Sequence, residues 1–237
     1  MAAPFFYHPQ LLQGSKIIEL DETSSRHIVQ VLRMKEGEQI HLTNGKGILA
    51  LTTITHASKK SCMVTILESH FEKIPVKRKI AIGISPVKNS SRFEWFLEKA
   101  TELGVSEIFP LLCNRTEREH FRYERMNNIC ISAMLQSQQA WLPVLHEPVP
   151  FITLTETVAG YDNKWIAHCI EQQKNELTSC LSPLVKNGIL LIGPEGDFTP
   201  EEIEQAIAKE FKPVSLGNTR LRTETAGIAA ATVLLLA

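Results

Sequence analysis

Two loops in the last third of the chain contain residue types that commonly bind a small molecule through the main chain. The first follows the apolar run 189–192 and has the sequence GPEG at 193–196. The second runs from Leu216 to Thr223 and contains Gly217. Glycine has no side chain to hold a ligand away, so backbone groups at such positions can contact it closely. Both loops are therefore candidate walls of a ligand site.

The pattern around the first loop predicts a strand before it and a helix after it. Residues 189–192 have the continuous apolar character of a strand buried on both faces. Residues 199–202 have the capping-box spacing, with proline at the first helical position. The second loop likewise lies between a short strand and an apolar helix that begins at about Glu224.

Ligands of open parallel sheets bind beyond the carboxyl ends of the strands. We therefore expect the two loops to follow neighbouring parallel strands and to form two walls of one pocket. By itself, GPEG fits a simple tight turn equally well. A Walker loop is excluded because Gly-Lys-Ser/Thr is missing, and the first loop is not Gly-x-Gly-x-x-Gly either.

The sequence pattern changes once along the chain, which predicts two domains. Up to about residue 72, short β-branched segments between turn signals such as Asn44-Gly45 predict a small all-β module. From residue 79, apolar strands alternate with amphipathic helices, for example a helix within 92–105 that Gly104 ends. This alternation predicts an α/β domain with a mostly parallel sheet. We expect the domains to span residues 1–72 and 73–237.

Composition limits the class of protein further. The 237 residues carry a formal net charge of −1, so any surface for nucleic acid must be local. Five cysteines without a Cys-x-x-Cys pair indicate reduced thiols rather than a disulfide framework or a zinc site. The start lacks the layout of a signal peptide, and no apolar run reaches the roughly 18 residues that span a bilayer. We expect a soluble, cytoplasmic protein without a metal ion or a membrane contact.

Several motifs, taken in their order along the chain, resemble one family. They are RHIVQVLRMKEGEQIHLTNGKG at 26–47, EKATELGV at 98–105, GPEG with its acidic helix, and LG at 216–217 followed by LRTETA at 221–226. Together they are similar to the ribosomal RNA small subunit methyltransferase E family, which belongs to the knotted SPOUT class. The resemblance covers nearly the whole chain. It implies a PUA-like, RNA-binding β-barrel followed by a SPOUT α/β methyltransferase domain with a C-terminal trefoil knot.

The resemblance also implies an activity and a cofactor. Members of the family transfer a methyl group from S-adenosylmethionine to N3 of a uridine in 16S ribosomal RNA, the RNA of the small subunit. Their cofactor lies in the loops of the knot. Carried onto this chain, the cofactor-binding residues are Leu191, Ile192, Gly193, Pro194, Glu195, Gly196, Leu216, Gly217, Asn218, Leu221, Arg222 and Thr223.

Arg222 and Glu195 are the candidate catalytic residues. The imide oxygens of uracil gain negative charge as the N3 proton leaves, and a nearby arginine would stabilise that charge. Arg222 suits this role or the binding of a substrate phosphate, and the alternative is a surface ion pair with Glu224. Glu195 is a candidate general base by its location, and the alternative is a carboxylate that accepts backbone N–H groups.

Scattered cations predict the RNA contacts. The span 73–92, which includes Lys77, has no acidic residue, and the run 114–125, which includes Arg118, is rich in arginine. An ordinary solvated surface is the alternative for both segments. The candidate RNA-binding residues are Arg26, Arg33, Lys88, Arg92, Arg115, Gln136 and Arg220.

Several positions depart from the family pattern, among them Leu135, which stands where the family usually has glutamate. Gln139 and Thr219 stand where the family usually has arginine, and Asp197 stands where it usually has a second glycine after GPEG. Arg220, one position after Thr219, is a candidate to replace the lost charge. These changes affect the RNA contacts expected from the family more than they affect the expected cofactor loops.

The C-terminal segment 226–237 is apolar on every side of a helix, so we expect it to be covered all round, partly by the knot and partly in a homodimer. The sequence leaves two functions other than methyl transfer open. A non-catalytic RNA-binding protein on the same scaffold would bind RNA without the cofactor. A small-molecule enzyme on an α/β sheet would bind a nucleotide and ignore ribosomes, and the missing phosphate loop disfavours it.

Overall fold

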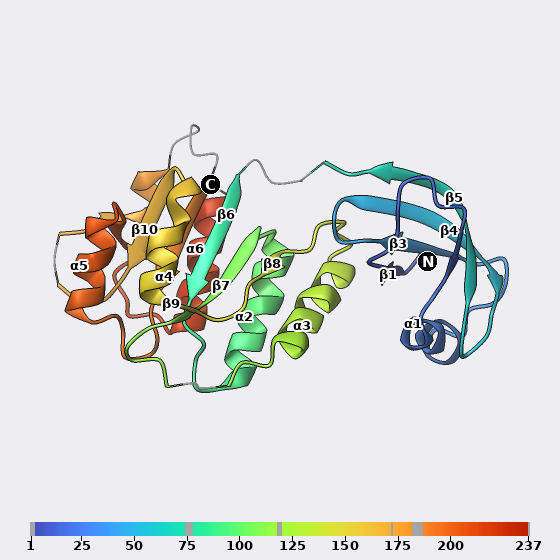
Figure 1. Cartoon of the computed structure of the whole chain (residues 1–237), viewed down its shortest axis with the longest axis horizontal. Coiled ribbons are helices and arrows are strands. Elements are labelled where there is room, and N and C mark those ends of the chain that lie inside the picture. Colours follow the sequence, from blue (N-terminus) through green and yellow to red (C-terminus); the bar gives the residue numbers. More distant parts are fainter. Residues whose placement is uncertain (1–2, 74–77, 118–119, 172, 182–186, 237) are drawn as a thin grey trace. The chain divides into compact units, whose positions relative to one another are not determined.

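The computed structural model describes residues 3–73, 78–117, 120–171, 173–181 and 187–236 (Figure 1). Lys77 and Arg118, which the sequence singles out as cations, lie outside the described residues. The chain forms two compact units. The N-terminal unit comprises the described residues up to 73 together with Met134–Leu142, and the C-terminal unit comprises the other described residues. The sequence pattern suggests a single boundary between residues 72 and 73. The segment Met134–Leu142 lies after that boundary but belongs to the N-terminal unit.

The N-terminal unit is built on a five-stranded sheet in the order β1-β3-β4-β5-β2. β1 pairs with β3 in parallel, and the other neighbours pair antiparallel. Successive side chains of a strand point to opposite faces of the sheet, so Ile40 and Leu42 share one face. Both side chains are fully buried in the core, which shows that this face is the buried one. The strands are β1 (Phe5–Tyr7), β2 (Ile17–Glu19), β3 (Gln39–Thr43), β4 (Ile48–His56) and β5 (Met63–Phe71).

This unit is not all-β, which corrects the prediction from the sequence. A short helix, α1 (Glu22–Arg26), continues into a π-helical turn, η1 (His27–Val31). Asp21 caps α1, and its carboxylate accepts the Ser24 N–H at 2.9 Å. Ile28 is fully buried in the core of the unit. The cap and this burial outweigh the strand preference of the β-branched residues in HIVQV.

Hydrogen bonds explain why Met134–Leu142 belongs to the N-terminal unit. Trp141 Nε1 donates to the Glu72 carbonyl at 3.0 Å, and the Leu142 N–H donates to the Gly45 carbonyl at 2.9 Å. Gly47 has a φ of 92°, and a Cβ atom there would collide with the Trp141 ring. The turn after β3 is therefore shaped to fit Trp141.

The C-terminal unit contains an eight-stranded sheet in the order β11-β13-β10-β12-β6-β7-β8, with β9 also paired to β7. Every strand pair is parallel, which confirms the predicted parallel sheet. The strands are β6 (Lys79–Ile84), β7 (Glu107–Leu112), β8 (Val144–Leu145), β9 (Val149–Pro150), β10 (Asn163–Ala167), β11 (Asn175–Glu176), β12 (Asn187–Ile192) and β13 (Lys212–Ser215).

Helices cover both faces of this sheet (Figure 1). The elements are α2 (Ser90–Leu103), α3 (Tyr123–Gln136), α4 (Phe151–Thr157), α5 (Pro200–Ala208) and α6 (Thr223–Leu236), with short 3-10 turns η2 (Val158–Gly160) and η3 (Leu177–Cys180). On one face, Phe151 of α4 and Ile203 of α5 pack into one core cluster with Ala81 of β6. On the other face, Gly227 of α6 lies against Phe96 of α2 and Ile84 of β6.

The predicted helix ends are confirmed. Gly104 ends α2 in the left-handed conformation, with a φ of 89°. At the start of α5, Thr199 Oγ1 accepts the Glu202 N–H at 3.3 Å, and Glu202 Oε2 accepts the Thr199 N–H at 2.8 Å. None of the described helices has the length and apolar character that a membrane span requires.

Candidate active site

A cavity of about 680 Å³ lies at the carboxyl edge of the parallel sheet, where β10, β12 and β13 end. β10 lies between β12 and β13 in the sheet. The expectation that the two glycine-bearing loops follow neighbouring strands is therefore wrong. The loop after β10 adds a third wall between them, and the start of α6 also lines the cavity.

Most of the residues predicted to bind a cofactor line this cavity. They are Ile192, Gly193, Pro194, Glu195, Leu216, Gly217, Asn218, Leu221, Arg222 and Thr223. Leu191 and Gly196 are not among the lining residues. Leu191 is fully buried in the core cluster, because alternate residues of a strand point to opposite faces. Gly196 faces Arg115, whose side chain lies 3.3 Å from where a Cβ atom would be.

Hydrogen bonds from three other segments of the chain hold the GPEG loop in place. Thr223 Oγ1 donates to the Gly193 carbonyl at 3.0 Å, which ties the loop to the start of α6. Glu195 Oε1 accepts the Lys88 N–H at 3.1 Å, and Arg115 Nη1 donates to the Gly196 carbonyl at 2.7 Å. Of the two alternatives for Glu195, the geometry supports a carboxylate bound to a backbone N–H group.

Asp197 explains how this chain accommodates a side chain where the family usually has glycine. Its φ is 63°, in the left-handed region that favours glycine and, among other residues, Asn and Asp. One carboxylate oxygen accepts the Cys169 N–H at 2.7 Å, and the other accepts the Phe198 N–H at 2.9 Å. Asp197 therefore joins the GPEG loop to the loop after β10.

We expect substitutions of Asp197 to separate backbone strain from hydrogen bonding. Asp197→Gly removes the carboxylate but tolerates the conformation, and it should lower the free energy of unfolding by about 1–2 kcal/mol. Asp197→Val adds a β-branched residue in the left-handed region, for a further loss of roughly 1–2 kcal/mol. Urea denaturation of both variants measures the difference. Equal stabilities would show that the conformation of Asp197 stores no strain.

The second loop carries two arginines. Arg220 and Arg222 both line the cavity and are exposed to solvent. Within the part of the chain that the structure describes, Arg222 has no ion pair. Glu224, its expected alternative partner, instead lies 3.7 Å from Arg92 Nε. The Glu224 side chain is 9% exposed, and its Oε2 atom is buried without a hydrogen bond to the described residues.

The third wall consists of residues that the sequence pattern did not single out. Ala167 is the last residue of β10, His168 and Cys169 follow it, and Lys174 lies slightly further along the chain. Burial and the nearby Lys174 ammonium group lower the pKa of His168, so that its imidazole is neutral at pH 7. The segment KWIAHCI at 164–170 has a strand-like pattern. Its carboxyl end could have been predicted to line the site, because ligands bind beyond the carboxyl ends of parallel strands.

The predicted RNA-binding residues are spread over both units. In the N-terminal unit, Arg26 forms an exposed ion pair with Glu22, Arg33 has a φ of 56°, and Gln136 is exposed near the end of α3. In the C-terminal unit, Lys88, Arg92 and Arg115 contact Glu117, Glu224 and the GPEG loop, respectively. Arg220 is part of the cavity itself.

Two family descriptions match the chain. Residues 73–235 match an RNA methyltransferase domain, and residues 20–67 match an RNA methyltransferase PUA domain. The first match covers most of the C-terminal unit, including all three walls of the cavity.

Relatives agree with these matches over nearly the full chain. The chain is 32% identical to the ribosomal RNA small subunit methyltransferase E of Synechocystis, over 86% of the chain and 68% of the relative. It resembles the crystal structure of a probable rRNA methyltransferase from Porphyromonas gingivalis with a TM-score of 0.90 and 37% identity, covering 98% of this chain and 96% of that one. The enzyme of the same family from Neisseria gonorrhoeae, solved bound to S-adenosylmethionine, has a TM-score of 0.89 and 27% identity, with 98% and 97% covered. The chain therefore belongs to the ribosomal RNA small subunit methyltransferase E family.

Proposed function

We propose that this protein methylates N3 of a uridine in 16S ribosomal RNA, with S-adenosylmethionine as the methyl donor. The cavity at the carboxyl edge of the sheet carries this proposal, because a relative of the same fold is bound to S-adenosylmethionine. The proposed site of action is the cytoplasm, and the proposed RNA-binding domain spans residues 1–72, followed by the methyltransferase domain at 73–237. The C-terminal trefoil knot of the family stays a prediction for this chain.

The cavity suits this cofactor in size and lining. Its volume of about 680 Å³ lies within the usual range of small-molecule sites. An apolar surface for the adenine base of the cofactor is formed by Ile192, Leu216, Leu221 and Ala226. The main chain can come close to the ligand at Gly193 and Gly217. When bound, S-adenosylmethionine supplies a methyl carbon made electrophilic by its sulfonium group.

The side chains at the cavity have distinct proposed roles. Arg222 stabilises the negative charge on the imide oxygens of the target uracil as the N3 proton leaves to solvent. Glu195 fixes the GPEG loop through the Lys88 N–H rather than acting as the general base. Neutral His168 and the carboxylate of Asp197 shape the wall next to β10. Positioning of the cofactor and the base then supplies much of the rate.

The test is methylation of 16S ribosomal RNA transcribed in vitro, alone and assembled into small subunits, followed by mass spectrometry of the nucleosides. We expect 3-methyluridine in at least one of the two substrates when S-adenosylmethionine is present. RNA binding without cofactor binding would instead identify a non-catalytic RNA-binding protein. Absence of both activities would refute the proposed function.

We also predict a homodimer, on the basis of helix α6. Ala230 and Leu234 of α6 are fully buried, whereas Leu236 is 68% exposed and Ile228 and Val233 are partly exposed. One copy of the chain therefore covers only part of this helix, and its expected coverage by a second copy stays a prediction. A second copy would bury the remaining apolar side chains. Light scattering at micromolar concentration should give twice the chain mass of 26.6 kDa, and the mass of a single chain would contradict the prediction.

A further inference from the structure

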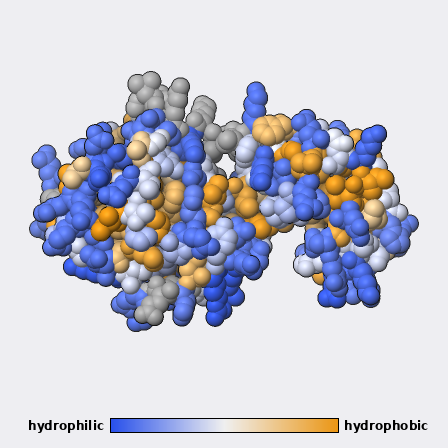
Figure 2. Space-filling view, in the orientation of Figure 1, coloured by the Kyte–Doolittle hydropathy of each residue, from blue (hydrophilic) through white to orange (hydrophobic). Residues whose placement is uncertain are grey.

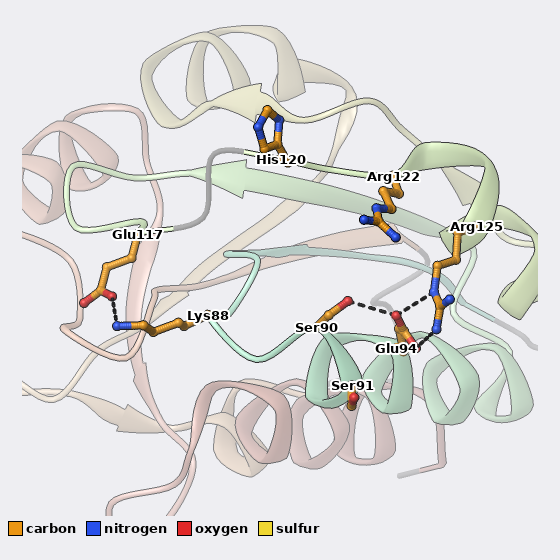
Figure 3. A pocket seen from close by; sticks show the side chains of 8 residues that line it. All are labelled: Lys88, Ser90, Ser91, Glu94, Glu117, His120, Arg122 and Arg125. Carbon is orange, nitrogen blue, oxygen red and sulfur yellow. Dashed lines mark hydrogen bonds and ion pairs between the residues drawn. The ribbon is translucent and has the colours of Figure 1, made fainter.

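A second groove, of about 600 Å³, lies between the N-terminal ends of α2 and α3 (Figure 3). Its lining is charged and polar, and hydrophilic residues cover this part of the surface in Figure 2. The residues that matter for the argument are Lys88, Ser90, Glu94, Glu117, Arg122 and Arg125. Five of these side chains already have partners within the groove.

The two acidic residues are neutralised by cations. Arg125 binds Glu94 with two hydrogen bonds, of 2.8 Å from Nε and 2.9 Å from Nη2, and Ser90 Oγ donates to the same carboxylate at 2.8 Å. Lys88 Nζ lies 3.0 Å from Glu117, but both side chains are more than half exposed. Exposed pairs of this kind contribute little stability and exchange partners readily. Lys88 is therefore available to a stronger anion.

Arg122 lines the groove without a side-chain partner among the described residues. It is exposed, and its side chain has no hydrogen bond or ion pair with any residue in the described ranges. In Figure 3 its guanidinium group extends from the start of α3 into the groove, toward Ser90. A guanidinium group matches the geometry of a phosphate, and the exposed Lys88 adds a second cation to the groove. The groove is therefore suited to a phosphate.

The position of the groove indicates which phosphate it holds. Lys88 lies at the rim of the groove, and its N–H group donates to Glu195 Oε1. Glu195 lines the cavity, so this hydrogen bond connects the groove with the cavity. A polynucleotide with one base at the cavity can therefore place its neighbouring backbone at this rim. We propose that the groove binds a phosphate of the RNA backbone beside the target uridine, and that Arg122 is the residue that pairs with it. This inference rests on the proposed function.

The experiment compares full-length wild type with Arg122→Ala, Arg122→Glu and Lys212→Ala. Lys212 is an exposed cation at the amino end of β13, away from the carboxyl edge of the sheet, and serves as the matched control. Binding to unmodified 16S ribosomal RNA is measured by fluorescence anisotropy over a range of salt concentrations. We expect Arg122→Ala to weaken binding about tenfold and to reduce the slope of log K against log salt by about 0.7–0.9, as one lost phosphate contact predicts.

Several controls separate the possible outcomes. Arg122→Glu should weaken binding more than Arg122→Ala, whereas Lys212→Ala should match wild type, and all variants should bind S-adenosylhomocysteine as wild type does. An unchanged affinity and salt slope in both Arg122 variants, with an active wild type, would overturn only the role of the groove. Phosphate ion that binds wild type but not Arg122→Ala, without any effect on RNA, would overturn the assignment to the RNA backbone. An inactive wild type would instead count against the proposed function.

Discussion

Arg222→Ala is expected to lower the rate of methyl transfer by about 10²–10³, the usual effect of removing one donor that stabilises charge in a transition state. Arg222 lines the cavity, is exposed, and has no ion pair among the described residues, so the described part of the fold does not depend on its charge. Glu224, which could have paired with it, lies instead beside Arg92. Single-turnover methylation of 16S ribosomal RNA measures the rate.

The affinity for S-adenosylhomocysteine separates this role from cofactor binding. Calorimetric titration of Arg222→Ala should give a Kd within about threefold of wild type, since the other contacts with the cavity wall stay in place. Arg222→Lys keeps the charge without the planar fork and should recover part of the rate. A rate for Arg222→Ala close to that of wild type would show that Arg222 is an ordinary surface residue. Loss of cofactor binding would assign it to the cofactor instead.

Much of the site could be predicted because its signals are local. The apolar run 189–192, the capping box at Thr199 and Glu202, and the glycines of the two loops each depend on residues a few positions apart. Local patterns of this kind predicted the strand ends and helix starts that surround the cavity. They also placed the left-handed glycine at the end of α2.

The remaining features depend on residues that are distant in the sequence. The position of β10 between β12 and β13 depends on strand order, which hydrophobic periodicity does not encode, so the wall formed by His168 and Cys169 was missed. The fit of Trp141 to the turn after β3 joins residues almost a hundred positions apart. Asp197 stands where the local conformation favours glycine, and part of its explanation is the Cys169 N–H, which belongs to a distant segment of the chain. Functional loops commonly break local rules in this way.

Gly193→Val is expected to weaken the binding of S-adenosylhomocysteine by about 10- to 100-fold. A Cβ atom at Gly193 would lie 3.0 Å from the Phe198 backbone nitrogen and 3.1 Å from the Phe198 ring, which is fully buried and has little room to move. Crowding of this kind costs about 1–3 kcal/mol, and a tenfold change in Kd corresponds to about 1.4 kcal/mol. The GPEG loop must therefore shift, and its hydrogen bond from Thr223 to the Gly193 carbonyl shifts with it.

Gly160→Val is the matched control for this substitution. Gly160 also lacks a positive φ, but a Cβ atom there would have no atom within 4 Å, so the same change in side chain meets open space. Calorimetry should give wild-type affinity for Gly160→Val and a large loss for Gly193→Val, while circular dichroism shows that both variants are folded. Because the crowding at Gly193 is confined to the loop between β12 and α5, a folded Gly193→Val protein with wild-type affinity would exclude that loop from the cofactor site. The GPEG sequence would then be only a tight turn.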